Sequence, residues 1–426
     1  MNLRVYPGPL HGEVERVIPS KSQLHRALIC AALAKRPVTV QNAALCRDVQ
    51  ATACCLRALG AKIGRRGDCL RVTPIPAKAH QGALLDCGES GSTLRFLLPL
   101  AAALGVECAF TGRGRLAERP LSPLREAMEA NGARLSAAGA FPLRCAGRLR
   151  PGAYDLRGGA SSQFVSGLLM ALPLLAGDSE IRVSGDLPSR PYVDMTLDML
   201  IAFSVVVLET KAGFRVPGGQ RYAGPECFSP EADWSAAAFW LAAGALSEKG
   251  VACAGLNPDS RQGDRAILTM LRRFGAEVAV DGSRVTARRG ALRGADWDAA
   301  DTPDLAPVWT VLAAAAVGES RISHIQRLRL KESDRVAGIA AMARALGAEA
   351  EAQADALIIR GRGRLRGAVI DAQGDHRLAM AAAIAAGAAE GPVVIRGAEA
   401  ADKSYPGFFE ALAALGGRAE EAQDAV

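Results

Sequence analysis

The sequence predicts an α/β protein of two domains, built from six copies of a βαβαββ unit. Three observations support this fold class. The chain has 426 residues, and a single hydrophobic core stops growing near roughly 250–300 residues. Apolar, Ala- and Leu-rich helical segments recur at intervals of about 71 residues, and such a period indicates a repeat architecture. Each of these segments is followed by a second helical segment, and short β-like runs come next.

The first helix of each unit opens with a polar group and continues as an apolar segment. The six segments are Lys21–Ala34, Ser90–Leu104, Ser161–Ala176, Asp233–Leu246, Asp304–Val317 and Asp375–Ala386. Their starts differ by 69, 71, 72, 71 and 71 residues. The repeat therefore fills the chain, but it does not indicate a chemistry, because repeats also build scaffolds.

The second helix of each unit ends at a position that favours glycine, the residue that readily adopts the left-handed conformation after a helix. Five units have a glycine there, and the third has Ser204 instead: Gly60, Gly132, Ser204, Gly275, Gly347 and Gly416. Short strand-like runs follow, such as 205–208 and 277–280. Ser204 is therefore the exception to the repeat.

Composition excludes several classes of protein. The net charge is +7, but the basic residues are scattered, whereas nucleic-acid binding usually shows a basic stripe or tail. Small anionic substrates explain the charge better. Only 8 of the 51 basic residues are Lys, so a Lys inside a motif suggests that a compact amine able to move a proton is needed.

The ten cysteines form no CxxC pair and no His cluster accompanies them, so we expect reduced, mostly buried thiols, no metal and no cofactor. The N-terminus lacks the pattern of a secretory signal. The longest apolar runs, such as 308–317, are far shorter than the ~20 residues of a membrane span. We therefore expect a soluble, cytoplasmic protein.

The six helix starts differ between the two halves of the chain. The first three open with Lys-Ser, Ser-Gly-Ser-Thr and Ser-Ser-Gln, and the last three open with Asp. All of these residues are good N-caps, so capping alone remains an alternative. The functional interpretation is that helix N-termini favour anions. Hydroxyls, Lys and amides from one half would then hold a phosphate, while carboxylates from the other would hold hydroxyls or move protons.

Two motifs in the first half favour anion binding. Lys21, Ser22 and Arg26 open the first helix, and Arg26 lies four residues beyond Ser22 on the same face. This is a phosphate grip without the glycine run of a P-loop; a basic solvated first turn is the alternative. The segment 111–120 is a basic loop ending at a helix start, and it either closes over an anion or forms an exposed hairpin.

Two motifs in the second half combine cations with carboxylates. We expect 331–335 to begin a helix, with Lys331 and Arg335 on one face and Glu332 beside them as a proton carrier. A surface ladder of salt bridges is the alternative. In the sixth core helix we expect Asp375 to be the N-cap, Arg377 to face a cleft and His376 to be a structural hydrogen bonder.

Taken together, nine motifs resemble the 5-enolpyruvylshikimate-3-phosphate synthases, a family of enolpyruvyl transferases. They match in order over nearly the whole chain: 21–26, 88–95, 115–120, 161–164, 190–192, 303–304, 331–335, 375–377 and 403–406. The resemblance implies a two-domain inside-out α/β barrel with three units per domain. It implies one domain of residues 19–229 and another of 1–18 and 230–426, with crossings near Pro19 and Pro230 and the active site in the cleft between them.

The resemblance also implies the reaction. The enolpyruvyl group of phosphoenolpyruvate would pass to the 5-hydroxyl of 3-phosphoshikimate by addition and elimination, with release of phosphate, on the route to chorismate and the aromatic amino acids. No cofactor and no partner besides these two substrates would be needed, and a monomer is expected. The family's inhibitor glyphosate would lie near Gly91.

Residue roles carry over by motif. The 3-phosphoshikimate ligands would be Lys21, Ser22, Arg26, Ser161, Ser162, Gln163, Ser189, Asp304, Arg327 and Lys331. The phosphoenolpyruvate ligands would be Lys21, Gly91, Arg115, Gln163, Arg335, Arg377 and Lys403. Asp304 would be the base, with Glu332 and Lys21 as proton carriers. Glu89 and Arg327 stand where the family pattern has Asn.

Two other functions fit parts of the pattern. The related transferase that acts on UDP-N-acetylglucosamine has Lys-Asn in the first helix and a loop Cys, whereas this chain has Lys21-Ser22 and no Cys in 113–120. A non-catalytic repeat scaffold that binds polyanions is the third possibility. Phosphate release from the two expected substrates separates all three.

Overall fold

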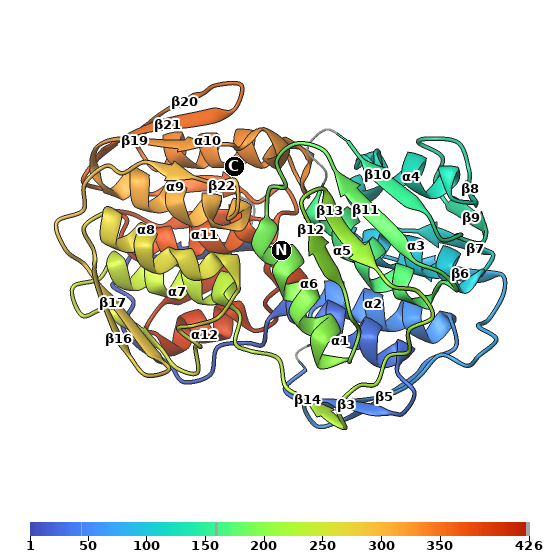
Figure 1. The fold of residues 1–426 in the computed structure, drawn as a ribbon. Helices are drawn as coiled ribbons and strands as arrows, with labels where there is room; N and C mark the ends of the chain where they lie inside the picture. Colours follow the sequence, from blue (N-terminus) through green and yellow to red (C-terminus); the bar gives the residue numbers. More distant parts are fainter. Residues whose placement is uncertain (44, 158–160, 423–426) are drawn as a thin grey trace. The chain divides into compact units, whose positions relative to one another are not determined.

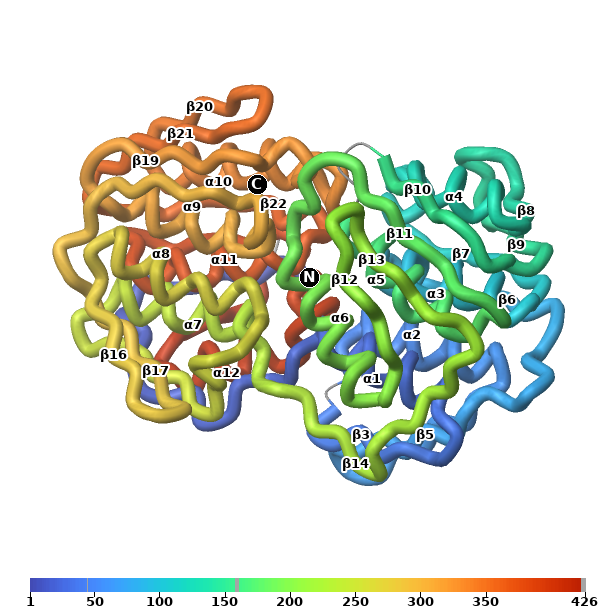
Figure 2. The backbone as a smooth tube through the Cα atoms, in the orientation of Figure 1, coloured from blue at the N-terminus to red at the C-terminus, as the bar shows by residue number. Residues whose placement is uncertain are grey.

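The computed structural model describes residues 1–43, 45–157 and 161–422. The chain divides into two compact units, and each has its own hydrophobic core. The inserted unit is Pro19–Pro230. The two-segment unit consists of Met1–Ile18 and Glu231–Val426. The first 18 residues therefore belong with the second half of the chain; in Figure 2 a dark blue tube runs beside the yellow, orange and red segments.

The inserted unit contains three pairs of helices and three sheets among its described residues (Figure 1). Its helices are α1 (Lys21–Leu33), α2 (Arg47–Ala58), α3 (Gly91–Leu104), α4 (Leu124–Ala130), α5 (Ser162–Ala171) and α6 (Arg190–Ala202), with 3₁₀ turns η1 (Gly114–Glu118) and η2 (Leu172–Leu174). Its strands are β3 (Val38–Val40), β4 (Lys62–Arg66), β5 (Cys69–Thr73), β6 (Ala83–Asp86), β7 (Cys108–Thr111), β8 (Ala133–Leu135), β9 (Leu143–Gly147), β10 (Ala153–Leu156), β11 (Ser179–Val183), β12 (Leu208–Thr210), β13 (Gly213–Val216) and β14 (Cys227–Phe228).

The two-segment unit repeats this plan. Its helices are α7 (Trp234–Ala245), α8 (Ile267–Arg273), α9 (Ala306–Ala315), α10 (Arg335–Ala345), α11 (His376–Ala386) and α12 (Phe408–Ala414), with 3₁₀ turns η3 (Gly263–Ala266), η4 (Pro303–Leu305), η5 (Gln326–Leu330) and η6 (Ala398–Lys403). Its strands are β1 (Asn2–Tyr6), β2 (Gly12–Val14), β15 (Val251–Cys253), β16 (Glu277–Asp281), β17 (Arg284–Arg288), β18 (Trp297–Asp298), β19 (Val317–Ser323), β20 (Glu349–Ala352), β21 (Ala356–Arg362), β22 (Ala368–Asp371), β23 (Val393–Arg396) and β24 (Arg418–Glu421).

All six described sheets have four strands. In each sheet one edge pair is parallel and the other two pairs are antiparallel. In the sheet β6-β7-β9-β8 the first pair is parallel and the next two pairs are antiparallel. The sheet β18-β19-β21-β20 has the same pattern. Read along the chain, β6-α3-β7-α4-β8-β9 is the predicted βαβαββ unit. The six-repeat α/β fold is thus confirmed.

Strands from distant parts of the chain complete some of these sheets. β1 pairs antiparallel with β23 and β24, so the N-terminus supplies the last strand of the sixth unit. β2 pairs in parallel with β15, and β14 pairs in parallel with β3. Hydrogen bonding between remote strands therefore ties the first 18 residues to the two-segment unit.

The apolar helices form the cores. In the two-segment unit α7, α9 and α11 contact one another, and every residue of α11 is buried. These are the segments that the 71-residue repeat predicts. The fifth departs in detail: η4 comes first and α9 starts at Ala306, with Pro307 in its first turn, where a missing N–H costs no helical bond. The third stops at Ala171, because Pro173 lies in the turn η2 that follows.

Ser204 stands at the position where the other repeats have glycine, and like those glycines it has a positive φ. Its φ is 58°, in the left-handed region, where Gly60 and Gly347 have φ of 110° and 98°. A residue with a Cβ pays roughly 1–2 kcal/mol there. The third unit therefore keeps the repeat geometry at the expense of local strain.

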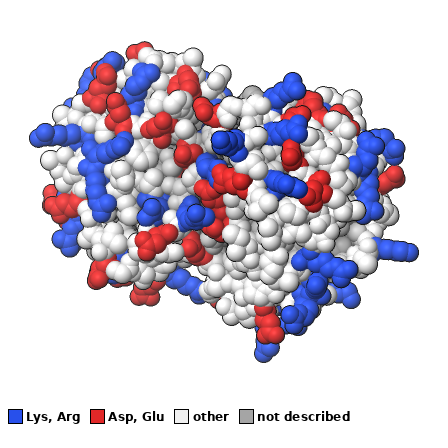
Figure 3. All heavy atoms as spheres, in the orientation of Figure 1, with Lys and Arg blue, Asp and Glu red and all other residues white. Residues whose placement is uncertain are grey.

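The surface charge and the apolar content of the helices bear on two expectations drawn from composition. On the face drawn in Figure 3, basic side chains are spread over both units and alternate in many places with acidic ones. Among the described residues, no helix has both the length and the apolar character needed to cross a membrane.

Candidate active site

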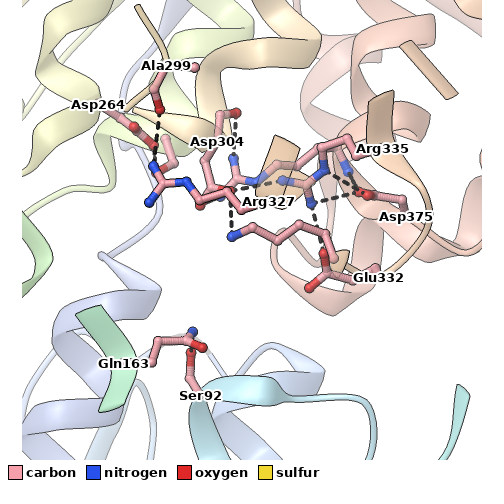
Figure 4. A network of polar contacts seen from close by, with 12 residues as sticks. Ser92, Gln163, Asp264, Ala299, Asp304, Arg327, Glu332, Arg335 and Asp375 are labelled. Atoms are coloured by element: carbon pink, nitrogen blue, oxygen red, sulfur yellow. Dashed lines mark hydrogen bonds and ion pairs between the residues drawn. The ribbon is translucent and has the colours of Figure 1, made fainter. Parts of the chain in front are cut away.

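The two-segment unit gathers charged groups around Asp304, which lies in the turn η4 just before α9. Its carboxylate accepts hydrogen bonds from Arg335 Nη1 at 3.0 Å and Arg377 Nη2 at 2.8 Å. Lys331 Nζ is 3.9 Å from Oδ1. We call Asp304, Lys331, Glu332, Arg335, Asp375 and Arg377 the acid–guanidinium cluster; Figure 4 shows its centre.

Arg335 is the centre of this cluster and has a side chain only 1% exposed. It donates to Asp375 Oδ2 through Nε at 2.9 Å and to Glu332 Oε2 through Nη2 at 2.8 Å. Burial alone would lower the pKa of Arg335, but Asp375, Glu332 and Asp304 outweigh it and raise the pKa. The guanidinium therefore stays charged and holds three carboxylates in fixed positions.

The expected helix start at 331–335 is wrong in detail. Helix α10 begins at Arg335 with Asp334 as its N-cap, whose side chain accepts from Ala337 N. Lys331 lies before it, at the end of η5 and in extended conformation. Lys331 and Arg335 converge because both contact Asp304, and not because they share a helix face. Desolvation by surrounding groups lowers the pKa of Lys331 to about 8.

The helix-start aspartates have different roles. Asp233 and Asp375 are N-caps, accepting from Ala236 N at 3.0 Å and Arg377 N at 2.9 Å. Asp304 caps no helix, and its carboxylate is turned to the cations. Helix capping alone therefore explains Asp233 and one of the two roles of Asp375, but it does not explain Asp304.

Three further groups of this unit were expected from the motifs. Arg377 is buried and also lies 3.4 Å from Asp304 O through Nη1. Lys403 is buried and donates to Gly374 O. Arg327 donates to the carbonyl oxygens of Ala299 and Ala300, so at least part of its guanidinium is turned to the backbone that precedes Asp304.

In the inserted unit, Lys21 begins α1 as expected. Its Nζ forms a 2.9 Å ion pair with Asp48 Oδ2 at the start of α2. Ser20 caps the helix by accepting from Gln23 N. The first turn of α1 is thus neither simply solvated nor purely cationic.

Arg26 is turned into the unit. Arg26 as a whole is 2% exposed, and its guanidinium donates to Thr196 Oγ1 at 2.7 Å, Tyr192 O at 2.8 Å and Ser22 O at 2.7 Å. Ser166 Oγ is 3.3 Å from Nη2. Burial lowers the pKa of Arg26 to about 10. In this arrangement Arg26 joins α1 to α5 and α6.

Gln163 is held at the start of α5 by the neighbouring helix α3. Its Nε2 donates to Ser92 Oγ at 2.9 Å, and its Oε1 accepts from Arg95 Nη1 at 2.6 Å. Figure 4 shows Gln163 and Ser92 side by side. We call Ser92, Arg95 and Gln163 the amide–hydroxyl cluster.

The three serines expected to bind phosphate lie at helix starts. Ser161 is the N-cap of α5 and accepts from Gln163 N, and Ser162 is the first residue of that helix. Ser189 precedes α6 with φ of 59° and is buried. Gly91 begins α3, and a Cβ there would come 2.7 Å from Arg119 Nη1. A larger residue there would have to displace the end of the Arg119 side chain.

The basic loop forms the turn η1 rather than a hairpin. Arg115 Nε pairs with Glu118 Oε2 at 3.1 Å. Glu89 lies against this turn, since a Cβ on Gly114 would meet its Oε2 at 3.1 Å.

Sequence reasoning gave no role to several residues that contact the expected ones: Asp48, Ser92, Arg95 and, in its second role as a partner of Arg335, Asp375. The spacing of Ser92 and Arg95, three residues apart in α3, was a usable signal for a shared face. Nothing in the sequence paired Lys21 with Asp48 across two helices.

Comparison with known proteins gives the family. The model of the EPSP synthase (3-phosphoshikimate 1-carboxyvinyltransferase) family matches residues 5–412. The chain belongs to this family. A 3-phosphoshikimate 1-carboxyvinyltransferase of Clostridium kluyveri is 41% identical over 98% of each chain. One from Halobacterium salinarum is also 41% identical, over 98% of this chain and 99% of the relative.

A solved structure supports the fold. The EPSP synthase of Acinetobacter baumannii aligns with a TM-score of 0.80, covering 99% of this chain and all of that one, at 24% identity. As an EPSP synthase family member the chain is an enzyme, a transferase of the shikimate route to aromatic amino acids. The reaction class predicted from the motifs is confirmed, and the family implies phosphoenolpyruvate and 3-phosphoshikimate as substrates.

Proposed function

We propose that residues of both units bind these two substrates and that the acid–guanidinium cluster carries the proton transfers. The observation behind this proposal is Asp304, a carboxylate that caps no helix and contacts Lys331, Arg335 and Arg377. Such cations suit an anionic substrate, since each phosphate carries roughly −1.5 to −2 charge. Bidentate Arg groups match both carboxylate and phosphate.

The 3-phosphoshikimate ligands in this proposal come mainly from the inserted unit. Its phosphate takes the hydroxyls of Ser161, Ser162 and Ser189. The remaining contacts are Lys21, Ser22, Arg26, Gln163, Asp304, Arg327 and Lys331. The preorganisation of Gln163 by Ser92 and Arg95 supports its part in this set.

The phosphoenolpyruvate ligands in this proposal are Lys21, Gly91, Arg115, Gln163, Arg335, Arg377 and Lys403. Binding exchanges some of the present contacts for substrate. The bound substrate competes with Asp304 for Arg377, and it competes with Asp48 for Lys21. Such exchange leaves each buried cation paired at every stage, which avoids the penalty for an uncompensated charge.

The reaction proceeds by addition and elimination. The 5-hydroxyl oxygen bonds to C2 of phosphoenolpyruvate, its proton passes to Asp304, and the methylene carbon takes a proton from Glu332 or Lys21. A tetrahedral ketal results. The C2–O bond to phosphate then breaks, a methyl proton returns to Glu332 or Lys21, and the double bond re-forms. The cluster's guanidinium groups stabilise the charge that develops in both steps.

Substrate choice is tested by phosphate release. With phosphoenolpyruvate present, we expect release to require 3-phosphoshikimate. Release that instead requires UDP-N-acetylglucosamine would favour the other transferase, and binding without release would favour a scaffold. We further propose that the protein is a monomer, to be checked by light scattering on the purified protein. We also propose a cytoplasmic location, to be checked by cell fractionation.

A further inference from the structure

A row of four buried polar side chains joins helices α1, α2 and α3 of the inserted unit. Each residue is at most 2% exposed, and we call them the polar row: His25 of α1, Thr52 of α2, Thr93 of α3 and Ser90, the N-cap of α3. His25 Nδ1 and Thr93 Oγ1 each lie 2.7 Å from Thr52 Oγ1. Thr93 Oγ1 lies 2.8 Å from Ser90 Oγ. None of the four has a role among the expected substrate ligands.

The protons along the polar row have one direction that satisfies every contact. Thr93 Oγ1 also lies 3.4 Å from Asp48 O, a carbonyl that can only accept. The Thr93 proton is therefore turned to Asp48 and Ser90, and Thr93 must accept from Thr52. The Thr52 hydroxyl has one proton as well, so Thr52 must accept in turn from Nδ1 of His25.

His25 supplies the first proton of the row as a neutral ring. Burial, with Lys21 and Arg26 nearby, lowers the pKa of His25 well below its ordinary value, so only one ring nitrogen carries a proton. Nε2 is buried and has no hydrogen-bond partner among the described residues. A buried N–H without an acceptor is rare in proteins. The proton therefore belongs on Nδ1, where Thr52 accepts it.

The polar row ends at two expected phosphoenolpyruvate ligands, Gly91 and Lys21. Ser90 caps α3 by accepting from Thr93 N at 3.2 Å, and Gly91 is the next residue. Asp48, whose carbonyl contacts Thr93, holds Lys21 Nζ at 2.9 Å through its carboxylate. Buried polar networks that are fully satisfied are rigid. The row therefore determines how the starts of α1, α2 and α3 meet.

We propose that His25 is a positioning residue: its Nδ1–H directs the polar row and so holds Gly91 and Lys21 in place for phosphoenolpyruvate. The inference rests on the proposed ligand set. His25 itself touches no substrate. Without the first donor, the hydroxyls of Thr52 and Thr93 can reverse, and the contact with Asp48 is lost.

Two variants interrupt the row at successive members. His25→Leu removes the donor, and Thr52→Val removes the hydroxyl that accepts from it. For each we expect the KM for phosphoenolpyruvate to rise roughly two- to tenfold, the effect of one hydrogen bond between neutral groups. We expect kcat to change little, because substrate binding is affected and proton transfer is not. Initial rates of phosphate release at saturating 3-phosphoshikimate measure both constants.

A conservative variant and a control accompany them. His25→Asn places an amide N–H near the position of Nδ1 and should restore most of the binding. Thr310→Val is the matched control, because Thr310 is a buried threonine whose hydroxyl donates within its own helix α9, to Ala306 O. It should leave the KM unchanged. The double variant of His25→Leu and Thr52→Val should raise the KM no further than the larger single effect, since both interrupt the same row.

Nitrogen NMR of the histidine rings reads the tautomer directly. We expect the proton of His25 on Nδ1, and the signals that disappear in His25→Asn identify this ring. A proton on Nε2 would overturn the inference. So would an unchanged KM for phosphoenolpyruvate in folded Thr52→Val, even with lowered stability, because the row would then serve the fold alone. A KM in His25→Asn as high as in His25→Leu would contradict the need for the donor.

Lys21→Met separates this inference from the proposed ligand set. If Lys21→Met keeps a normal KM for phosphoenolpyruvate, the ligand set is wrong and the inference is wrong with it. If Lys21→Met raises the KM and Thr52→Val does not, the ligand set stands and only the positioning role of His25 is wrong.

Discussion

The acid–guanidinium cluster of the two-segment unit and the amide–hydroxyl cluster of the inserted unit both lie near the starts of helices, but their polar groups are paired differently. In the first, each cation is paired with a carboxylate: Asp304, Glu332 and Asp375 surround Arg335. In the second, Gln163 is held by a hydroxyl and one guanidinium. A repeat therefore supplies positions, whereas the side chains at those positions supply the chemistry.

The consequence is a division between binding and proton transfer. Neutral hydroxyls and amides bind a phosphate without first losing an ion pair. Carboxylates among guanidinium groups cost more to assemble, but they can exchange protons and partners. Substitutions in the two clusters should therefore differ in whether they change kcat or KM, and the following predictions test that division, from the largest effect to the smallest.

Asp304→Ala removes the proposed base and the anionic partner of three cations. We expect kcat to fall by roughly 10²-fold or more, the usual range for a general base. Steady-state phosphate release measures it. Asp281→Ala, at an exposed position in the β16–β17 hairpin, should change little; a near-normal kcat in Asp304→Ala would remove Asp304 from the mechanism.

Glu332→Gln keeps the volume and a hydrogen bond to Arg335 but cannot carry a proton. We expect kcat to fall by about 10²-fold with a much smaller change in KM. Glu349→Gln, which loses only an exposed ion pair with Arg362, is the matched control. An effect on KM alone would make Glu332 a binding residue and would weaken the contrast between the clusters.

Arg377→Ala removes a buried guanidinium without removing a proton carrier. We expect the KM for phosphoenolpyruvate to rise by about tenfold or more, because hydrogen bonds to charged groups contribute roughly 1.5–3 kcal/mol. Initial rates at varied phosphoenolpyruvate measure this. An unchanged KM would reject the contact.

We expect the titration of Lys331 to make the KM for 3-phosphoshikimate depend on pH in the basic range. Its pKa is lowered to about 8, so the ammonium is present below that pH and is lost as the pH rises through it. We expect the KM for 3-phosphoshikimate to increase above pH 8. In Lys331→Arg the charge persists and the increase should disappear; a limb that remains belongs to another group.

Ser204→Gly tests the repeat itself, away from either cluster. Relief of left-handed strain, roughly 1–2 kcal/mol, exceeds the extra backbone entropy of Gly, roughly 0.5–1 kcal/mol. We expect a gain in unfolding free energy of about 0.5 kcal/mol in urea titrations. Ser204→Ala keeps the strain and should show no gain.

Much of the fold followed from local pattern. The apolar repeat located the core helices, and glycine placement located the ends of the others, because both depend on spacing along the chain. Pro173 lies in the turn that ends the third core helix a few residues early, whereas Pro307 is tolerated in the first turn of α9, where its missing N–H costs no helical bond. Ser204 shows that the geometry of a repeat can persist where the preferred residue is absent.

The candidate site followed from motifs only in part. Asp304, Glu332, Arg335 and Arg377 were expected together, and they are in contact. The geometric reason given for Lys331 was wrong, since it lies outside α10. Asp48 and Arg95 were not expected, because their partners are far away in sequence and no local period joins them.

The sequence by itself determined the repeat, the family resemblance and which residue types stand at each helix start. Only the tertiary structure decided which charges meet. Asp304 and Asp375 stand at the same place in the sequence of successive repeats, at the start of the first helix. The carboxylate of Asp304 is turned to the cations, whereas Asp375 both caps α11 and holds Arg335. The reason is physical: capping is a local backbone interaction, whereas ion pairing and desolvation depend on side chains that folding brings together from distant segments.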